Sequence, residues 1–357
     1  MHIHLFTTES LYSYELLKLF ETTVNLQEHL FIFRKKDKSG KFTYTPAIES
    51  RIIYSTNFIH LTRYILPKME SAKWIYFHYL PYGPSLILWA LKPSLIVKST
   101  WIVWGGDVFI YKQKNLSLKN RLFEFLRRRI IPRFPEIAAF VEADAREAIK
   151  VYNSKAEYIQ ILYPIPVNLE DLVDLKTKSP EITKKILIGN SADPSNNHLE
   201  MLEMLSGFCQ ENIKIYCPLS YSIDQSYIDS VVKKGHEIFD EKFIPLLTMM
   251  NTREYALFLN DMDIAVMNHR RQQGLGSIMP LLYLGKKLFL RSETSSYPFL
   301  TNAGCIIFDT CSMNRSNFDQ FIFIHKTSCE ANKNVIEKMI NPSYYSPLWN
   351  NLFNKHQ

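Results

Sequence analysis

The sequence predicts an α/β protein with two domains, each built on a parallel, doubly wound sheet. Apolar runs that are typical of buried strands alternate with amphipathic helical stretches along the chain. A proline-containing polar segment over 163–180 interrupts this alternation once. Since 357 residues suffice for two cores, we expect domains over 1–165 and 181–335, and a helical segment over 336–357 that packs back on the first domain.

The first half opens with a strand and then alternates regularly. Runs rich in Ile, Val, Phe, Tyr and Trp predict strands, because branched and aromatic side chains suit a half-buried pleated surface. Leucines at helical spacing predict helices. The predicted strands are 3–6, 30–34, 74–79, 99–107 (which ends in a glycine turn), 138–143 and 157–163, and the predicted helices are 10–24, 59–69 and 85–92.

The second half restarts the same alternation after residue 180. The predicted strands are 184–191, 212–219, 236–240, 263–268, 286–291 and 304–309, and the predicted helices are 198–208, 226–235 (ended by Gly235) and 252–262. Two Rossmann-like domains facing a central cleft form the GT-B architecture of nucleotide-sugar glycosyltransferases. Because other enzymes share this architecture, the fold alone does not fix the function.

Bulk composition excludes several classes of protein. The start of the chain lacks the features of a signal peptide, and no apolar run is long enough to span a membrane. Five cysteines without paired spacing indicate a reduced, cytoplasmic protein without a structural zinc. We therefore expect neither metal nor cofactor, and Asp261-Met262-Asp263 precedes a strand instead of following one, which disfavours a metal role.

The net charge of +7 originates in one segment. Residues 112–133 contain eight Lys or Arg and one Glu, and they predict an amphipathic basic helix. Its predicted apolar face holds Leu118, Leu122, Phe125, Leu126 and Ile130, and its basic residues include Lys119, Arg121, Arg127, Arg128 and Arg129. Such a helix suits an anionic membrane surface, or it packs on its own domain and solvates its charges. No nucleic-acid motif accompanies it.

A glycine loop in the second half suggests an anion site. The apolar run 264–267 leads into a basic turn, and Gly274-Leu275-Gly276-Ser277 then opens an apolar helical stretch. Glycines allow a backbone to approach an anion, and a helix N-terminus attracts negative charge. The candidate ligands of a nucleoside diphosphate are Arg270, Arg271, Gln272, Gln273, Gly274, Gly276 and Ser277. The alternative is plain turn chemistry.

A second loop follows the first strand of the second half. Ligands bind beyond the carboxyl ends of strands in such sheets, and this loop carries Gly189, Asn190, Ser191, Asp193 and Asn196 as candidate donor-binding residues. Asn196 or Asn197 could instead cap the next helix. The residues Tyr216, Pro218 and Tyr221 follow the next strand and could line the nucleotide base.

The first half offers two candidate bases for an acceptor hydroxyl. Asp107 ends the stretch Trp104-Gly105-Gly106-Asp107, and His78 ends the strand 74–79. The predicted acceptor contacts are Trp101, Trp104, Gly105, Gly106 and Tyr79. The alternatives are that Asp107 caps the turn, that the tryptophans are core residues, and that His78 is structural.

Four of these stretches together resemble a known family. The segments WIVWGGD, ILIGNSADPSNNH, IKIYCPLSY and RRQQGLGS occur in the order and spacing of the TDP-N-acetylfucosamine:lipid II N-acetylfucosaminyltransferase (4-alpha-L-fucosyltransferase) family. The resemblance covers nearly the whole chain. Two positions depart from it, since Tyr79 and Ala192 stand where the enterobacterial members have glycine.

The resemblance implies a peripheral enzyme on the cytoplasmic face of the inner membrane. It would transfer 4-acetamido-4,6-dideoxygalactose, or a related fucose-like sugar, from a TDP- or UDP-linked donor to a polyprenyl-diphosphate-linked glycan. The glycan would belong to common antigen, O-antigen or capsule. The reaction would need no metal, and the partners would include an anionic membrane surface but no nucleic acid. The alternatives are a nucleotide-sugar epimerase and a non-catalytic nucleotide-sugar or glycan-binding protein.

Overall fold

The computed structural model divides the chain into two compact units. Unit 1 comprises Met1–Pro164 and Pro342–Gln357, and unit 2 comprises Ile165–Asn341. The structure describes residues 1–37, 41–55, 57–112, 116–165, 167, 172, 175, 181–220, 224–315 and 317–357.

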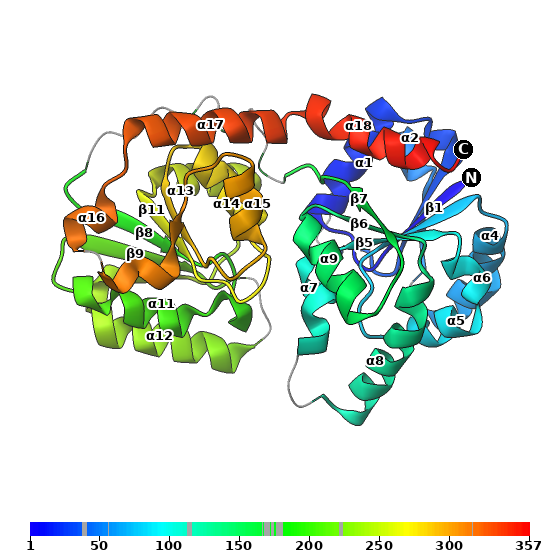
Figure 1. Cartoon of the computed structure of the whole chain (residues 1–357), viewed down its shortest axis with the longest axis horizontal. Helices are drawn as coiled ribbons and strands as arrows, with labels where there is room; N and C mark the ends of the chain where they lie inside the picture. The colour runs from blue at the N-terminus through cyan, green and yellow to red at the C-terminus, as the bar shows by residue number, and fades with distance from the viewer. Residues whose placement is uncertain are drawn as a thin grey trace. The chain divides into compact units, whose positions relative to one another are not determined.

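Unit 1 contains a seven-stranded parallel sheet with the order β3-β2-β1-β4-β5-β6-β7 (Figure 1). The strands are β1 (His2–Phe6), β2 (His29–Phe33), β3 (Ile52–Tyr54), β4 (Trp74–His78), β5 (Ser99–Val103), β6 (Glu136–Ala139) and β7 (Glu157–Gln160). The order reverses between β1 and β4. Parallel sheets bind ligands beyond the carboxyl ends of the strands at such a reversal.

Helices cover both faces of this sheet. Successive side chains of β1 point to opposite faces of the sheet and all five are buried, so both faces must be covered. The helices are α1 (Leu11–Thr23), α2 (Pro46–Glu49), α3 (Phe58–His60), α4 (Leu66–Glu70), α5 (Ser85–Leu91), α6 (Pro93–Ile96), α7 (Gly105–Val108), α8 (Leu118–Ile130), α9 (Glu142–Val151) and α18 (Pro342–Asn354). Ile3 and Leu5 face a core that includes side chains of α4, α5, α8 and α9. Phe6 faces an aromatic core with α1 and α18.

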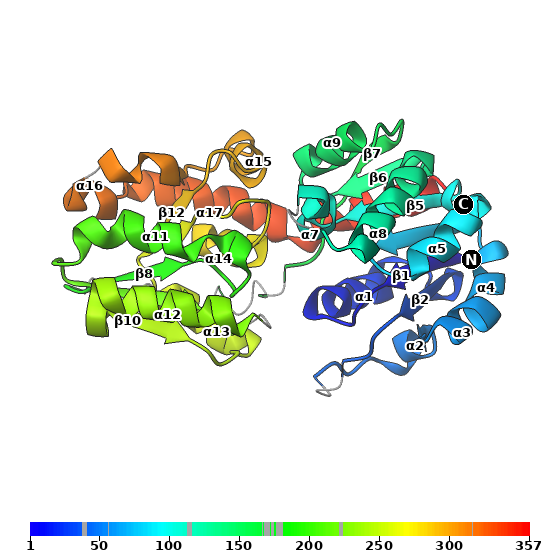
Figure 2. The same ribbon diagram turned by 90° about the horizontal axis from the view of Figure 1, so that it is seen from below.

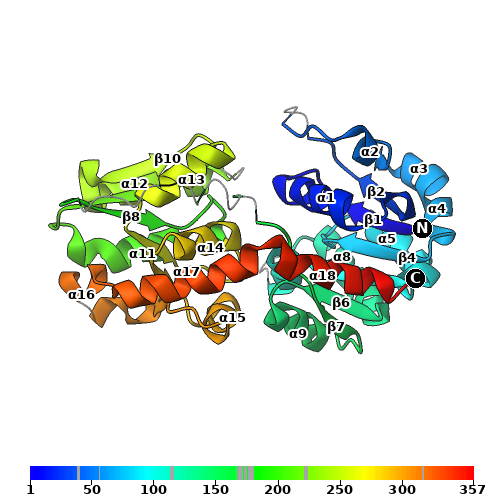
Figure 3. The ribbon, with the colours of Figure 1, turned by 90° about the horizontal axis from the view of Figure 1, so that it is seen from above.

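The C-terminal helix α18 completes unit 1. It lies beside α1 (Figure 3), and it places Trp349 and Phe353 in the aromatic core. The indole nitrogen of Trp349 donates a hydrogen bond to the carbonyl oxygen of Leu162 at 2.7 Å. The helix before it, α17 (Lys326–Ile340), belongs to unit 2.

Unit 2 contains a six-stranded parallel sheet with the order β10-β9-β8-β11-β12-β13 (Figure 2). The strands are β8 (Lys184–Ile188), β9 (Ile213–Pro218), β10 (Phe243–Leu246), β11 (Ile264–Met267), β12 (Lys287–Leu290) and β13 (Phe308–Asp309). The order reverses between β8 and β11. The remaining helices are α11 (His198–Leu205), α12 (Gln225–Phe239), α13 (Thr252–Asp261), α14 (Leu275–Tyr283), α15 (Ser296–Asn302) and α16 (Phe318–Ile322).

Two parallel sheets with helices on both faces confirm the α/β prediction, but some element boundaries were wrong. The stretch 236–240 is not a strand, because α12 continues past Gly235 to Phe239. A Cβ at Gly235 would lie 2.5 Å from the ring of Phe243, the first residue of β10. This glycine therefore leaves room for Phe243 and does not end the helix. The predicted strand 138–143 is shorter, and α9 begins at Glu142. None of the helices in the described ranges is both long and apolar enough to cross a bilayer.

Candidate functional site

The two predicted donor loops flank the reversal of strand order in unit 2. One loop follows β8 and spans 189–197, and the other follows β11 and spans 268–274. Hydrogen bonds connect them, since the Arg270 amide donates to the Ser195 carbonyl at 2.8 Å and the Ser195 hydroxyl donates to Gln273 Oε1 at 2.9 Å. The structure therefore brings together two segments that are separated by about 80 residues in the sequence.

The loop after β8 is held by its own polar side chains. Asn196 is fully buried, and its Oδ1 accepts from the Asn190 amide at 2.9 Å while its Nδ2 donates to Ser191 Oγ at 3.1 Å. Asp193 accepts from the amide of Ser195 at 2.8 Å. Burial raises the pKa of Asp193, but bonds from Ser195 and the charge of Arg271 outweigh it and lower the pKa. Asn196 and Asp193 thus shape the loop.

Two glycines make room where these loops meet. Gly189 and Gly274 have φ of 64° and 75°, which glycine tolerates best. A Cβ at Gly189 would lie 2.4 Å from His198 Nε2, and one at Gly274 would lie 2.8 Å from His269 Cε1. Gly274 is also the N-cap of α14, and no side chain caps that helix. The first turn of α14 therefore offers amide groups beside an uncrowded backbone.

Several polar atoms at this edge are buried and have no hydrogen-bond partner within the described residues. They are Asn190 Oδ1, His198 Nε2, both ring nitrogens of His269, and Gln273 Nε2. Burial lowers the pKa of His198 to about 4 and that of His269 to about 3. At His269, the charges of His198 and Arg271 lower the pKa further, and the Gln273 backbone raises it. Unpaired buried polar groups are costly in a folded protein, so this cluster suits a polar ligand.

The two predicted arginines contact the same loops. The Arg270 guanidinium donates to Asn197 Oδ1 at 2.7 Å, and Arg271 forms a 3.2 Å ion pair with Asp193. Arg270 is exposed and Arg271 is half-buried. Both cations are therefore at the edge where an anion would lie.

The other predicted donor residues are placed as follows. Gln272 and Gly276 are half-buried on either side of Gly274. Ser277 is buried, and its hydroxyl is 2.7 Å from that of Tyr255. Tyr216 packs on the ring of Phe258, and Pro218 ends β9. Tyr221 lies outside the described residues.

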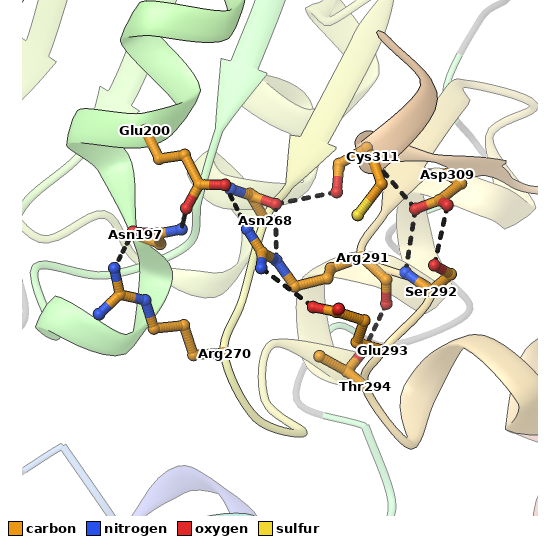
Figure 4. A network of polar contacts seen from close by, with 11 residues as sticks. Asn197, Glu200, Asn268, Arg270, Arg291, Ser292, Glu293, Thr294, Asp309 and Cys311 are labelled. Atoms are coloured by element: carbon orange, nitrogen blue, oxygen red, sulfur yellow. Dashed lines mark hydrogen bonds and ion pairs between the residues drawn. The ribbon is translucent and has the colours of Figure 1, made fainter.

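Sequence reasoning missed a polar network on the adjoining strand ends (Figure 4). Arg291 pairs with Glu200, and its Nε donates to Asn268 Oδ1 at 3.0 Å. Glu200 also accepts from Asn197, which in turn binds Arg270. Thr310 donates to Asn268 at 2.8 Å. No local sequence motif predicts these residues, because the network forms only when the ends of four elements meet.

The carboxyl edge of unit 1 corrects several predictions. Asp107 is fully buried, and its carboxylate accepts from the Leu80 amide (2.8 Å), the Trp101 indole (2.9 Å) and the Trp104 amide (2.7 Å). Burial raises the pKa of Asp107 to about 6, while Arg127 and these bonds act against the rise. The carboxylate joins the loops after β4 and β5, which fits the turn-capping alternative better than a base.

The predicted sugar contact of Trp101 is wrong, because its ring is fully buried and its indole N–H is bound to Asp107. Trp104 is half-buried and contacts the rings of Tyr12 and Tyr163. Tyr79 has a φ of 81°, which is strained for tyrosine, and its phenol lies against Gly106. Gly105 is buried at the start of α7.

His78 also has its hydrogen-bonding capacity filled. Its Nδ1 bonds to the Tyr163 hydroxyl and its Nε2 lies 3.0 Å from His4 Nδ1. His4 Nε2 lies 3.0 Å from His29 Nδ1 in turn. Burial holds the pKa of His78 and of His4 well below the usual value. Neither ring nitrogen of His78 is available to an acceptor hydroxyl in this arrangement.

The predicted apolar face of the basic helix α8 is divided between the protein interior and solvent. Ile130 is buried as expected, together with Phe123, whereas Leu118, Leu122 and Phe125 are 84%, 50% and 50% exposed. Arg127, predicted to face a membrane, is wholly buried. Its guanidinium donates to the carbonyl oxygens of Leu80 and Asp107 and to Tyr152. Lys119, Arg121, Arg128 and Arg129 are exposed.

The acidic pair Asp261 and Asp263, for which a metal role was disfavoured, has structural contacts. Asp261 pairs with Lys185 at 2.8 Å, and Asp263 accepts from the Lys185 amide at 2.8 Å. Both acids precede β11 and so lie at the amino end of the sheet. The candidate site lies at the opposite end.

Several solved structures share this arrangement over nearly the whole chain. Sucrose-phosphate synthase from Thermosynechococcus elongatus has a TM-score of 0.70 at 10% identity, covering 99% of this chain and 98% of the other. Alr3699/HepE from Anabaena, in complex with UDP and glucose, has 0.67 at 11%, covering 99% of each. WaaG, a glycosyltransferase involved in lipopolysaccharide biosynthesis, has 0.65 at 8%, covering 98% of each.

These likenesses, with the two doubly wound sheets, define the fold as that of a GT-B glycosyltransferase. The family described as 4-alpha-L-fucosyltransferase, glycosyl transferase group 56, matches residues 11–333. The chain belongs to this family and is a glycosyltransferase.

Proposed function

We propose that the enzyme transfers a deoxy-amino sugar from a TDP- or UDP-linked donor to a polyprenyl-diphosphate-linked glycan. The sugar is 4-acetamido-4,6-dideoxygalactose or a related fucose-like sugar. The observation that carries the donor part is the cluster of buried, unpartnered polar atoms beside the α14 N-terminus. The family supports the sugar class.

The donor diphosphate would bind at the first turn of α14. The amides there and the dipole of a nine-residue helix favour an anion. Arg271 and Asp193 form a partly exposed ion pair, a kind of contact that contributes only about 0–1 kcal/mol. A diphosphate carries more charge than Asp193 and can take its place. The same contacts would stabilise the departing nucleoside diphosphate.

The buried imidazoles suit the uncharged parts of the donor. The pKa values of about 4 and about 3 keep His198 and His269 neutral at pH 7, so each ring has one donor and one acceptor nitrogen. Asn190 Oδ1 needs a donor, and Gln273 Nε2 needs an acceptor. Hydroxyl groups and phosphate oxygens of a nucleotide sugar provide both.

The exposed face of α8 supports attachment to a membrane that carries the acceptor. Leu118, Leu122 and Phe125 lie among exposed Lys and Arg, which is the composition of helices that bind anionic bilayers. Helix α5 packs against α8 (Figure 2) and adds exposed Ile87 and Leu91. The proposed location is therefore the cytoplasmic face of the inner membrane, with α8 as the contact with the bilayer.

A thermal-shift measurement tests the donor site. TDP or UDP at about 1 mM should raise the melting temperature of the wild type more than GDP or CMP does. Gly274→Ala should abolish this shift, because the new methyl group would contact His269 and Asn190. Gly207→Ala is the matched control, since a methyl group there meets nothing within 4 Å. An unchanged shift in Gly274→Ala would refute the proposed donor position.

The transfer itself needs a lipid acceptor. Labelled TDP-4-acetamido-4,6-dideoxygalactose and bacterial membrane vesicles should yield label in the lipid extract. Nucleotide binding with neither lipid labelling nor nucleotide release would argue for a binding protein, and interconversion of the free nucleotide sugar for an epimerase.

A further inference from the structure

The loop after β1 has the same place in unit 1 as the donor loop after β8 has in unit 2. The strand order of unit 1 reverses between β1 and β4, so the loops over 7–10 and 79–84 flank the ligand-binding end of that sheet. These two loops contain one carboxylate, Glu9. It lies just before α1, whose N-cap is Ser10.

Glu9 is held in a defined position by neutral groups. Its side chain is 5% exposed. Oε1 accepts from the Tyr54 hydroxyl at 2.9 Å, and Oε2 accepts from the Asp37 amide at 2.8 Å. Burial, and then Glu9 itself, raises the pKa of Tyr54 and of Tyr44, so both phenols stay protonated beside the carboxylate. A carboxylate has about four lone-pair sites, so Glu9 can accept a further hydrogen bond beside those from Tyr54 and Asp37.

Two other buried carboxylates of unit 1 form ion pairs with cations. Glu124 pairs with Arg127 and Arg128. Glu136 pairs with Lys355 and His356, and these partners lower its pKa to about 2 despite burial. Glu9 forms no ion pair within the described part of the chain. A positioned carboxylate without a paired cation can accept a proton from a hydroxyl that lies within hydrogen-bond reach.

We propose that Glu9 is the general base of the transfer, an assignment that rests on the proposed function. Its carboxylate takes the proton of the acceptor hydroxyl as that oxygen forms a bond to the anomeric carbon of the donor sugar. The bond between the anomeric carbon and the diphosphate oxygen breaks, and the nucleoside diphosphate leaves with the electron pair. Glu9 then releases the proton to water.

The test compares Glu9→Gln with Tyr54→Phe in the lipid-labelling assay. Glu9→Gln preserves an acceptor oxygen for the Asp37 amide and removes the base, so kcat should fall by about 100-fold or more. Tyr54→Phe removes the neighbouring hydrogen bond and leaves the carboxylate, so kcat should fall less than tenfold. The melting-temperature shift with TDP should equal that of the wild type in both variants.

The pH profile separates a base from a positioning residue. The kcat/KM of the wild type should fall on the acid side, and this limb should be absent from the residual activity of Glu9→Gln. Turnover of Glu9→Gln within about threefold of the wild type, or equal losses in the two variants, overturns the assignment alone. No labelling by the wild type overturns the proposed function and the assignment with it.

Discussion

Two pairs of buried residues at the carboxyl edges of the two sheets have opposite hydrogen-bonding states. In unit 1, Asp107 and His78 are buried. The Asp107 carboxylate and both ring nitrogens of His78 form hydrogen bonds with other groups of the protein. In unit 2, His198 and His269 are equally buried, yet His198 Nε2 and both nitrogens of His269 lack a partner within the described residues. A satisfied network stabilises a fold, whereas an unsatisfied one is ready for a ligand.

This difference changes how conspicuous residues should be interpreted. Asp107 beside two glycines and His78 at a strand end have the sequence features of catalytic groups, but their contacts make them structural. His269 drew no attention in the sequence, and its lack of contacts makes it a candidate ligand residue. The number of unfilled hydrogen bonds separates the two cases better than residue type does.

The largest effect that we predict is a loss of stability of unit 1 in acid, caused by its buried histidines. Burial lowers the pKa of His2 to about 4 and of His29 to about 3, and it holds the pKa of His4 and His78 well below 6.5. The unfolded chain therefore binds more protons than the folded one below about pH 6.5. Their contribution to stability is present above that pH and is lost as pH falls toward 4.

All five tryptophans lie in unit 1, so tryptophan fluorescence measures its unfolding. Urea titrations between pH 7.5 and 4 should show a free energy of unfolding that falls steadily below about pH 6.5. A constant value over this range would contradict the neutral histidine chain.

Removing Arg127 should destabilise unit 1 by about 3–5 kcal/mol, because Glu124 and two carbonyl oxygens would lose a buried cation. The change is Arg127→Ala, and the measurement is urea unfolding followed by tryptophan fluorescence. Arg129→Ala is the control on the same helix, and its exposed side chain should matter by less than about 0.5 kcal/mol. Equal effects of the two variants would contradict the buried position of Arg127.

Leucine substitutions at two buried histidines test the comparison directly. His78→Leu leaves His4 and Tyr163 without their shared partner and should cost about 1–3 kcal/mol of stability, with TDP binding unchanged. His269→Leu removes atoms that have no partner and should change stability by less than about 1 kcal/mol while weakening TDP binding about tenfold. Unfolding curves and TDP titrations measure both. The reverse outcome would invert the roles assigned to the two edges.

The smallest effect concerns the exposed face of α8. Leu122→Ser combined with Phe125→Ser should weaken binding to phosphatidylglycerol vesicles about tenfold, because apolar area is lost from the bilayer contact. Leu257→Ser, at a leucine of unit 2 that is 51% exposed, is the control. Vesicle co-sedimentation measures the binding. Unchanged binding of the double variant would remove α8 from the proposed membrane contact.

The sequence predicts the strands well because their signals are local. The alternation of apolar runs and helices locates the strands β1, β2, β4, β8, β9 and β11, whereas β3 and β10 were not predicted. The partners of His4 could not be predicted, because they depend on which strands become neighbours. Pairing of β1 with β2 and β4 brings His29 and His78 to it.

Helix α8 shows the same limit. Periodicity identified an amphipathic helix but not the burial of Arg127, whose guanidinium donates to the Leu80 carbonyl oxygen, 47 residues earlier in the chain. A buried cation with distant acceptors leaves no signal in the spacing of apolar residues. The donor loops were easier, because glycines and a helix start lie together in the sequence.

The position of α18 has a consequence for the order in which the protein matures on the ribosome. Trp349 and Phe353 complete the aromatic core of unit 1, yet they are synthesised only after all of unit 2. The N-terminal part of unit 1 therefore keeps Leu16, Phe20 and Phe31 exposed until α18 is made. Unit 2, whose residues are already complete, can fold during this time. Because α18 is made after the rest of unit 1, truncating the chain after residue 341 would leave the nascent chain open to aggregation.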